Sequence, residues 1–223
     1  MIKIFITGNN TEVGKTFIAD NLIRLAIEQN KSVTPFKSVE TGCKKIKNQL
    51  IPNDSKKFFE SIKKKINLDI INPYRYYQPI SPYKAIKLAG KKVLIKDILS
   101  KIKKLPKSDI LVMEGAGGAF SPLTSDGLNI DLIDKTKAKT VLVVKDELGA
   151  INNTLVNVES FKSRKIKINA IVLNKIKSNT HKDINNLKEI KMYTNIPVFQ
   201  IFSSNENKNK EVFVKLLKLL TKS

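Results

Sequence analysis

The stretch FITGNNTEVGKTFIAD, residues 5–20, places a glycine-containing loop between an apolar run and an amphipathic run. The loop extends from Gly8 to Thr16 and has five residues rather than four between its two glycines. Glycine permits a tight turn, and a helix that starts after the loop directs free amides and the positive end of its dipole at it. The sequence therefore predicts a phosphate-binding loop, with an ordinary turn capped by Thr11 as the alternative.

Length and composition favour one soluble domain over residues 1–223. A chain of this length with 41% hydrophobic residues can bury a full core. The single cysteine, Cys43, gives no indication of an oxidising compartment. The first residues do not resemble a signal peptide, and no apolar run approaches the roughly 20 residues of a membrane span. We therefore expect a cytoplasmic protein.

The formal net charge of +21 raises the question of a nucleic-acid or membrane partner. The lysines are spread along the whole chain, and no nucleic-acid-binding motif accompanies them. A solvated lysine-rich surface is the favoured interpretation, with neither nucleic acid nor membrane as a partner. The single histidine, His181, lies in the polar stretch KSNTHKD and is expected at the surface.

Apolar runs alternate with helix-compatible segments along the chain. The predicted strands are residues 2–7, 32–36, 109–114, 140–145, 168–173 and 197–202. The predicted helices are residues 15–30, 54–66, 95–105, 151–164 and 209–220. This alternation predicts an α/β fold of the P-loop NTPase type, with a mostly parallel sheet and helices on both faces. Residues 71–82, with three prolines and three tyrosines, form the longest irregular stretch and are expected to be functional.

Active sites in such sheets gather at the carboxyl ends of the strands. After the first strand, Lys15 would reach phosphate oxygens and the Thr16 hydroxyl would bind Mg²⁺. After the second, Lys37 could neutralise a transferring phosphoryl group, although an ordinary surface lysine is the alternative.

Two carboxylates complete the candidate site. Asp54 is placed either to cap the helix that follows it or to bind a metal ion. Glu114 ends the apolar strand DILVME, where an acidic residue in a phosphate-loop protein typically holds Mg²⁺. A glycine-rich segment, residues 115–118, follows Glu114 and allows the backbone to pass close to a ligand.

Five stretches in series resemble the dethiobiotin synthetase family. They are TGNNTEVGKT, PFKSVETG, NPYRYYQPISP, MEGAGGAFSPL and LGAINNTL, and the resemblance runs in order from residue 1 to about residue 175. It implies an ATP- and Mg²⁺-dependent ligase that carboxylates 7,8-diaminononanoate with CO₂ and closes the ring of dethiobiotin in biotin synthesis. A carbamate and a carbamic-phosphoric anhydride would be the intermediates, so no protein nucleophile is required.

The resemblance also assigns roles to residues. The implied catalytic residues are Lys15, Lys37, Thr11 and Thr41. The implied nucleotide-binding residues are Gly8, Asn10, Glu12, Val13, Gly14, Lys15, Thr16, Phe17 and Asn174. The implied metal ligands are Thr16, Asp54 and Glu114. The implied substrate-binding residues are Thr41, Pro79, Ile80, Ser81, Gly117, Gly118, Gly149, Ala150, Ile151 and Asn152. Because family members are homodimers with the substrate across the interface, residues 149–152 would come from the other subunit.

Departures from the family lie near the C-terminal end. The last predicted strand continues as Phe199-Gln200-Ile201-Phe202-Ser203, which leaves open whether residues 199–205 select ATP strictly. The main alternative function is a nucleotide-switched P-loop ATPase of the partitioning or division-site type, acting on DNA or membrane. Those proteins carry an extra lysine early in the loop, where this chain has Asn9 and Asn10. A glutamine-dependent amidase is a further alternative, but the chain has no room for a glutaminase domain.

Overall fold

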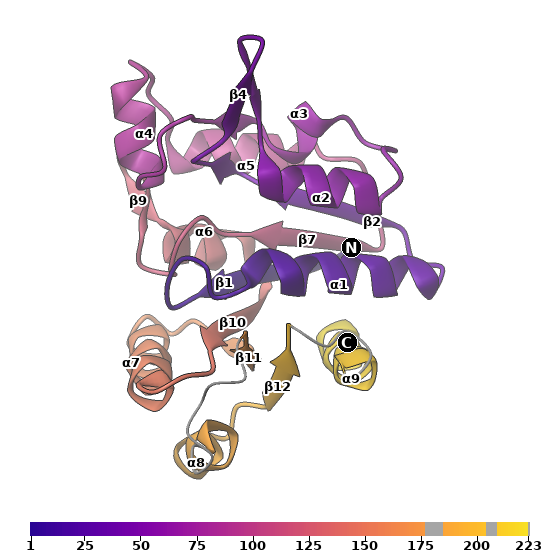
Figure 1. Cartoon of the computed structure of the whole chain (residues 1–223), viewed down its shortest axis with the longest axis vertical. Helices are drawn as coiled ribbons and strands as arrows, with labels where there is room; N and C mark the ends of the chain where they lie inside the picture. Colours follow the sequence, from indigo (N-terminus) through magenta and orange to yellow (C-terminus); the bar gives the residue numbers. More distant parts are fainter. Residues whose placement is uncertain (177–184, 204–208, 223) are drawn as a thin grey trace.

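The computed structural model describes residues 1–176, 185–203 and 209–222, and its centre is a six-stranded sheet (Figure 1). The strand order is β12-β11-β10-β1-β7-β2, and every neighbouring pair is parallel. The strands are β1 (Ile2–Gly8), β2 (Val33–Lys37), β7 (Ile110–Glu114), β10 (Lys139–Lys145), β11 (Ile168–Lys175) and β12 (Val198–Phe202). All six predicted strands are present, so the predicted parallel α/β sheet is confirmed.

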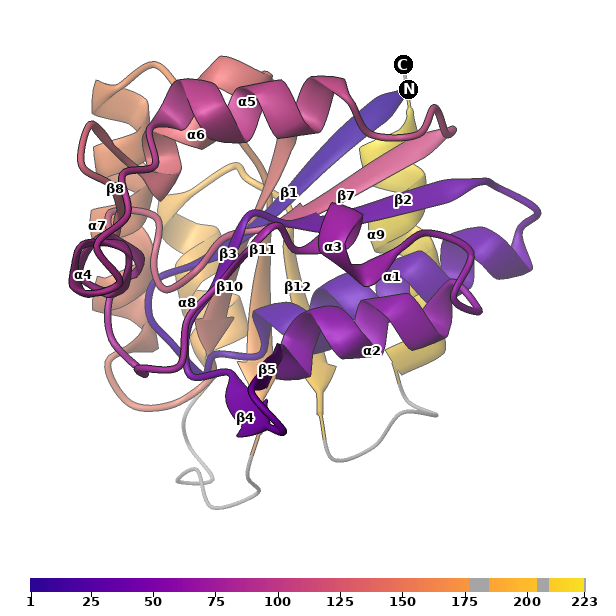
Figure 2. The same cartoon turned by 90° about the horizontal axis from the view of Figure 1, so that it is seen from above.

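Helices cover both faces of this sheet, as Figure 2 shows from above. The helices packed on one face are α1 (Lys15–Glu28), α2 (Asn53–Ser61), α3 (Leu68–Ile71) and α9 (Lys210–Thr221). The helices packed on the other face are α5 (Ile95–Lys103), α6 (Asn129–Thr136), α7 (Ala150–Ser163) and α8 (Asn186–Tyr193). A short helix, α4 (Pro82–Leu88), also buries Ala85 and Ile86 in the second cluster.

Side chains alternate between two hydrophobic clusters along each central strand. In β1, Ile4 and Ile6 join the cluster under α1, whereas Phe5 joins the cluster on the opposite face. In β10, Val143 joins the cluster under α1, and Val144 joins the cluster on the opposite face. Successive side chains of a strand point to opposite faces, so a strand covered by helices on both faces must be apolar throughout. This requirement explains the continuous apolar runs in the sequence.

Several short elements were not predicted. The helices α3, α4, α6 and α8 are absent from the sequence-based assignment. Three two-stranded ladders were also missed: β3 (Val39–Glu40) with β6 (Tyr74–Arg75), β4 (Lys44–Ile46) with β5 (Gln49–Ile51), and β8 (Pro122–Thr124) with β9 (Gly127–Leu128). Elements of two to eight residues are too short to establish a hydrophobic period. The prediction of a helix to residue 66 is also wrong, because Lys63 and Lys64 have positive φ angles that end α2.

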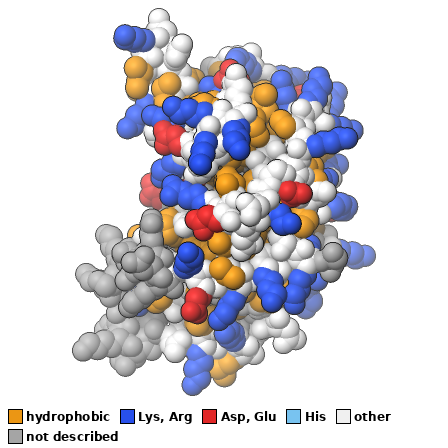
Figure 3. Space-filling model, turned by 90° about the vertical axis from the view of Figure 1, so that its right-hand side faces the viewer, with side chains coloured by type: hydrophobic (Ala, Val, Ile, Leu, Met, Phe, Trp, Pro, Cys, Tyr) orange, Lys and Arg blue, Asp and Glu red, His pale blue; other side chains and the backbone are white. Residues whose placement is uncertain are grey.

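Figure 3 shows lysine and arginine side chains spread over one face of the molecule rather than gathered in one place. Over the described residues, no helix combines the length and the apolar character needed to cross a membrane. The expected surface position of His181 falls outside the described residues.

The packing of α9 on the sheet gives a stability prediction. Leu216 is fully buried in α9, whereas its neighbour Lys215 is exposed. We expect Leu216→Ala to lower the free energy of unfolding by about 2–5 kcal/mol, because it removes apolar contacts and leaves a cavity. Urea denaturation followed by circular dichroism measures this change. The matched variant Lys215→Ala should change stability by less than about 0.5 kcal/mol, and equal effects of the two variants would contradict the assigned packing.

Candidate active site

The phosphate-binding loop joins β1 to α1 and holds Lys15 inside it. Gly14 precedes the helix with a φ angle of 96°, and a Cβ atom there would lie 2.1 Å from the side-chain nitrogen of Asn174. A side chain at this position would therefore displace the loop. The Lys15 ammonium donates a hydrogen bond of 2.7 Å to the backbone carbonyl of Asn10, across the loop. The predicted wrap of the backbone around this lysine is thus present.

Two lysines of the site have pKa values shifted in opposite directions. Burial lowers the pKa of Lys15 to about 8, and the nearby Glu114 carboxylate opposes this shift only in part. Burial also acts to lower the pKa of Lys37, but the carboxylates of Glu114 and Asp54 outweigh it and raise that pKa. Lys37 is therefore a permanent cation, whereas the charge of Lys15 depends on pH.

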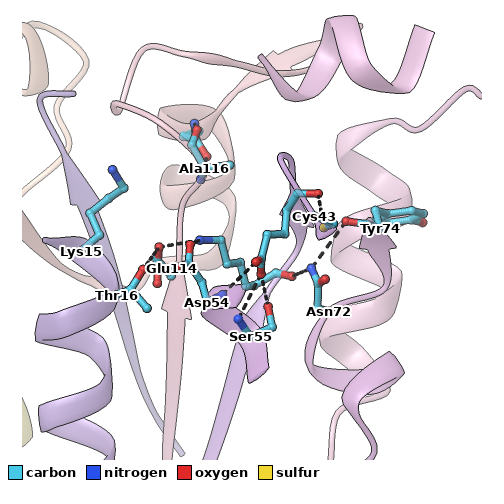
Figure 4. A network of polar contacts seen from close by, with 12 residues as sticks. Lys15, Thr16, Cys43, Asp54, Ser55, Asn72, Tyr74, Glu114 and Ala116 are labelled. Atoms are coloured by element: carbon cyan, nitrogen blue, oxygen red, sulfur yellow. Dashed lines mark hydrogen bonds and ion pairs between the residues drawn. The ribbon is translucent and has the colours of Figure 1, made fainter. Parts of the chain in front are cut away.

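A buried ion pair joins the ends of β2 and β7. Figure 4 shows its carboxylate member, Glu114, close to Thr16 and Asp54. The register of these parallel strands pairs Lys37 with Glu114. The Lys37 ammonium lies 2.7 Å from Glu114 Oε1 and also contacts the Asp54 carboxylate. The Thr16 hydroxyl donates to the same Glu114 oxygen at 3.0 Å. Four residues that are far apart in the sequence thus meet at one point.

The carboxylates respond to this cation differently. Burial raises the pKa of Glu114, and the adjacent Lys37 charge opposes the rise. Burial also acts to raise the pKa of Asp54, but the charge of Lys37 and its hydrogen bond outweigh burial and lower that pKa. Asp54 therefore remains ionised at neutral pH.

The oxygens of Thr16, Asp54 and Glu114 fit a magnesium ion. Glu114 Oε2 is buried and has no hydrogen-bond partner within the part of the chain that the structure describes. Carboxylate and hydroxyl oxygens are the hard ligands that Mg²⁺ prefers. The Lys37 ammonium already lies between the two carboxylates, which indicates that this position attracts positive charge.

The beginning of α2 corrects one alternative for Asp54. The N-cap of this helix is Pro52, and Asp54 lies in the first turn with its side chain directed at Lys37. Asp54 therefore does not cap the helix. Instead, Glu40 accepts hydrogen bonds from the amides of Asp54 and Ser55 at 2.8 and 3.0 Å. The sequence analysis missed Glu40, because the β4–β5 hairpin separates it in sequence from the helix whose amides it binds.

Asn129 is a second residue that sequence reasoning missed. Its side chain is fully buried beneath the glycine-rich segment 115–118. The amide nitrogen donates to the carbonyls of Ala116, Gly118 and Ser121 at 2.8, 3.0 and 3.3 Å. Its oxygen accepts from the Ala116 amide at 3.2 Å. One asparagine therefore fixes the path of the segment that follows Glu114.

A cavity of about 720 Å³ connects these groups. The predicted site residues that line it are Thr11, Glu12, Gly14, Lys15, Thr16, Phe17, Lys37, Thr41, Asp54, Pro79, Ile80, Ser81, Glu114 and Gly117. The cavity therefore brings together the phosphate-binding loop, the ion pair and part of the proline- and tyrosine-containing stretch. Glu40 lies in its wall as well.

Other predicted residues lie outside the cavity lining. Gly118 packs against the loop, since a Cβ atom there would be 3.0 Å from the Asn9 carbonyl oxygen, and its contact with substrate stays a prediction. Gly8, Asn10 and Val13 belong to the loop but not to the lining. The helix start Gly149–Asn152 also lies outside the cavity of this single chain, so its contribution to a partner's site stays a prediction.

Asn174 binds the phosphate-binding loop through its side chain. Its side chain is fully buried and donates to the Val13 carbonyl at 2.9 Å. The Ser203 hydroxyl donates to the Asn174 side-chain oxygen. In this arrangement the side chain is not presented to a nucleotide base, so its contact with adenine stays a prediction.

Solved structures define the class of fold. A plasmid partition protein from Borrelia burgdorferi has a TM-score of 0.59 and 16% identity, with 99% of this chain and 96% of that chain covered. A structure of a plasmid partition protein from Borrelia burgdorferi B31 bound to AMPPNP has a TM-score of 0.57 at 16% identity, with 98% and 95% covered. The chain has the fold of P-loop NTPases.

Sequence relatives define the family within that class. A family model described as an AAA domain matches residues 3–211. The ATP-dependent dethiobiotin synthetase of Vesicomyosocius okutanii is 35% identical over 95% of this chain and 94% of its own length. That of Ruthia magnifica is 33% identical over 99% of this chain and 100% of its own length. The chain belongs to the ATP-dependent dethiobiotin synthetase family and is an enzyme of the ligase class, as its sequence motifs predicted.

The hydrogen bonds of Asn129 lead to a second stability prediction. Asn129→Ala leaves the buried amide of Ala116 without a partner and frees the glycine-rich segment. We expect the free energy of unfolding to fall by about 2–4 kcal/mol. Chemical denaturation of this variant and of Asn153→Ala, which alters an exposed asparagine of α7, measures the difference. A loss no larger than that of the control would contradict the role assigned to Asn129.

The lowered pKa of Lys15 gives a pH prediction. In the ligand-free protein this group loses its proton around pH 8, and nucleotide phosphate beside it would raise the pKa. Affinity for ATP should therefore be constant below pH 8 and decline above it, with proton uptake on binding. Calorimetry at pH 8.5 in buffers of different ionisation enthalpy measures the uptake. The Lys15→Arg variant should show none because its guanidinium stays protonated, and buffer-independent heats for the unaltered protein would contradict the prediction.

Proposed function

We propose that this protein, acting as one domain over residues 1–223, uses ATP and CO₂ to convert 7,8-diaminononanoate into dethiobiotin in biotin biosynthesis. One observation carries the proposal. The phosphate-binding loop and the Lys37–Glu114–Asp54 cluster share one cavity, in a chain whose relatives are named dethiobiotin synthetases. The phosphate groups of ATP and a carbamate formed on the substrate could therefore be bound next to each other in this cavity. We infer a cytoplasmic location from the same assignment.

The reaction requires no protein nucleophile. One amine of the substrate adds to CO₂, and loss of a proton gives a carbamate. A carbamate oxygen then attacks the γ-phosphorus of ATP, the bond to the β-γ bridging oxygen breaks, and ADP leaves. Finally the second amine attacks the carbonyl carbon of the mixed anhydride and releases a proton, phosphate leaves with the bonding electrons, and the ureido ring closes.

The two lysines would serve different steps of this sequence. Lys37, which its carboxylate neighbours keep protonated, would stabilise the negative charge of the carbamate and of the transferring phosphoryl group. Lys15 would contact the β- and γ-phosphates from inside the loop. Burial of both lysines strengthens their electrostatic interactions, because the local dielectric is lower than that of water.

Thr16, Asp54 and Glu114 would hold Mg²⁺, which supplies positive charge to the phosphate oxygens of ATP. Thr11 and Thr41, both in the cavity wall, would orient the carbamate through their hydroxyl groups. Pro79, Ile80 and Ser81 would form the wall against the carbon chain of the diamine and limit the access of water to the anhydride.

The distant carboxylate of the diamine would meet a helix start of a second subunit. In a homodimer, Gly149, Ala150, Ile151 and Asn152 would provide amides and the positive end of the α7 dipole. The adjacent Leu148 is 87% exposed in the single chain, so its side chain is available for contact with a second subunit. We infer that the substrate site is completed by the partner subunit.

The decisive assay combines the purified protein with ATP, Mg²⁺, bicarbonate and 7,8-diaminononanoate. Phosphate release and the mass of the product are followed together. Formation of ring-closed product that requires all four components supports the proposal. ATP hydrolysis that is indifferent to the diamine, without that product, would contradict it and favour a nucleotide switch acting on DNA or membrane.

A variant pair makes the assay specific to the site. We expect Lys15→Ala to reduce product formation about 100-fold or more, because charge stabilisation in the transition state is lost. Lys56→Ala, which removes an exposed lysine of α2, should leave the rate within about twofold. Thermal unfolding of both variants verifies that the fold is retained. Normal turnover by Lys15→Ala would refute the role of the loop.

A further inference from the structure

Glu40 has no role in the proposed chemistry, yet it is one of the most constrained side chains near the site. Only 4% of its surface is exposed. Its Oε1 accepts from the Asp54 amide, and its Oε2 accepts from both the amide and the hydroxyl of Ser55, the latter at 2.6 Å. A buried carboxylate with three donors has little freedom to move, because each lost bond would leave an unsatisfied group.

The backbone of Glu40 is fixed as well. Glu40 pairs with Arg75 in the β3–β6 ladder, and its carbonyl accepts from the Tyr76 amide at 2.9 Å. It follows Lys37 by only three residues, so the end of β2 and the carboxylate of Glu40 are held in one short segment. The position of the Glu40 carboxylate is therefore fixed relative to the Lys37–Glu114 pair.

The start of α2 has few other attachments. Its N-cap residue, Pro52, provides no side-chain hydrogen bond. Between the buried residues Cys43 and Pro52, the chain that leads to the helix is the β4–β5 hairpin, whose side chains are exposed or half-buried. A hairpin of this kind does not fix the position of the next residue. The hydrogen bonds to Glu40, together with the ion pair between Lys37 and Asp54, therefore hold the first turn of α2 against the site.

Asp54 is the residue that this attachment places. Its amide is bound by Glu40 and its carboxylate by Lys37, so the two ends of one residue are connected to the same short segment. Glu40 is not itself available as a metal ligand, because both of its carboxylate oxygens accept hydrogen bonds from the first turn of α2. In residues 1–176, 185–203 and 209–222, no three His, Cys, Asp or Glu side chains are arranged to hold an ion together.

We propose that Glu40 is a positioning residue that acts through Asp54 and thereby sets the affinity of the site for a divalent cation. The inference rests on the metal role of Asp54 in the proposed function. Residues that orient a metal ligand typically contribute 10–100-fold to affinity when they are removed. The negative charge of Glu40 also strengthens the dipole interaction at the start of α2.

The test measures binding of Mn²⁺ to the full chain in the presence of AMPPNP, by the loss of the free-ion signal in electron paramagnetic resonance. We expect Glu40→Gln to weaken Mn²⁺ binding by about 10–100-fold. Asp54→Asn should weaken it as well, and the double variant should bind like Asp54→Asn alone, because Glu40 acts through that ligand. Mn²⁺ affinity of Glu40→Gln within twofold of the unaltered protein, no effect of Asp54→Asn, or additive losses in the double variant would each overturn the proposal.

A second variant separates positioning from general loosening of the helix. Ser55→Ala removes the 2.6 Å hydroxyl bond to Glu40 but keeps both amide bonds. It should lower the midpoint of urea unfolding while Mn²⁺ affinity stays within about twofold. If Ser55→Ala weakens Mn²⁺ binding as much as Glu40→Gln does, the proposal fails. The ring-closure assay is independent, so a protein that makes the product but tolerates Glu40→Gln would refute this inference alone.

Discussion

The buried pair of Lys37 and Glu114 is the constraint on which the rest of the site depends. Two opposite charges at the ends of neighbouring strands are tolerated in the interior because each compensates the desolvation of the other. Removing either one would leave an uncompensated buried charge, which is far more costly than losing a surface ion pair. Thr16 and Asp54 gather around this pair because it offers the donors and acceptors that their own side chains need.

Two of the lysines that line the cavity differ in character. Lys37 is held by carboxylates and keeps its charge whether or not a ligand is present. Lys15 contacts a neutral carbonyl group, so its protonation is coupled to the arrival of negative charge. The carboxylates that line the cavity, those of Glu12, Glu40, Asp54 and Glu114, repel a polyphosphate. A cation that accompanies the nucleotide therefore favours binding, which agrees with the metal role inferred for Thr16, Asp54 and Glu114.

The central sheet was predictable because its strands must be apolar on both faces. Each strand therefore appears in the sequence as a continuous stretch of apolar residues. Lys15, Lys37 and Glu114 were also predictable, since parallel strands bring their carboxyl ends to one edge. Glu40 and Asn129 were not identified, because their importance comes from hydrogen bonds to segments distant in sequence that no local pattern reveals. The buried position of Asn174 depends in the same way on how β11 passes beneath the loop.

The attachment of α2 by Glu40 has a consequence for how the chain can change over evolution. The β4–β5 hairpin lies between Glu40 and Asp54, with its turn at Lys47 and Asn48, and its strands carry no fully buried side chain. Since neither neighbour depends on the hairpin for its position, insertions or deletions at that turn would alter only the closure entropy of an exposed loop. That entropy changes by only about 0.6 kcal/mol for each doubling of loop length. This segment can therefore acquire new sequence, and with it new contacts, without disturbing the chemistry a few residues away.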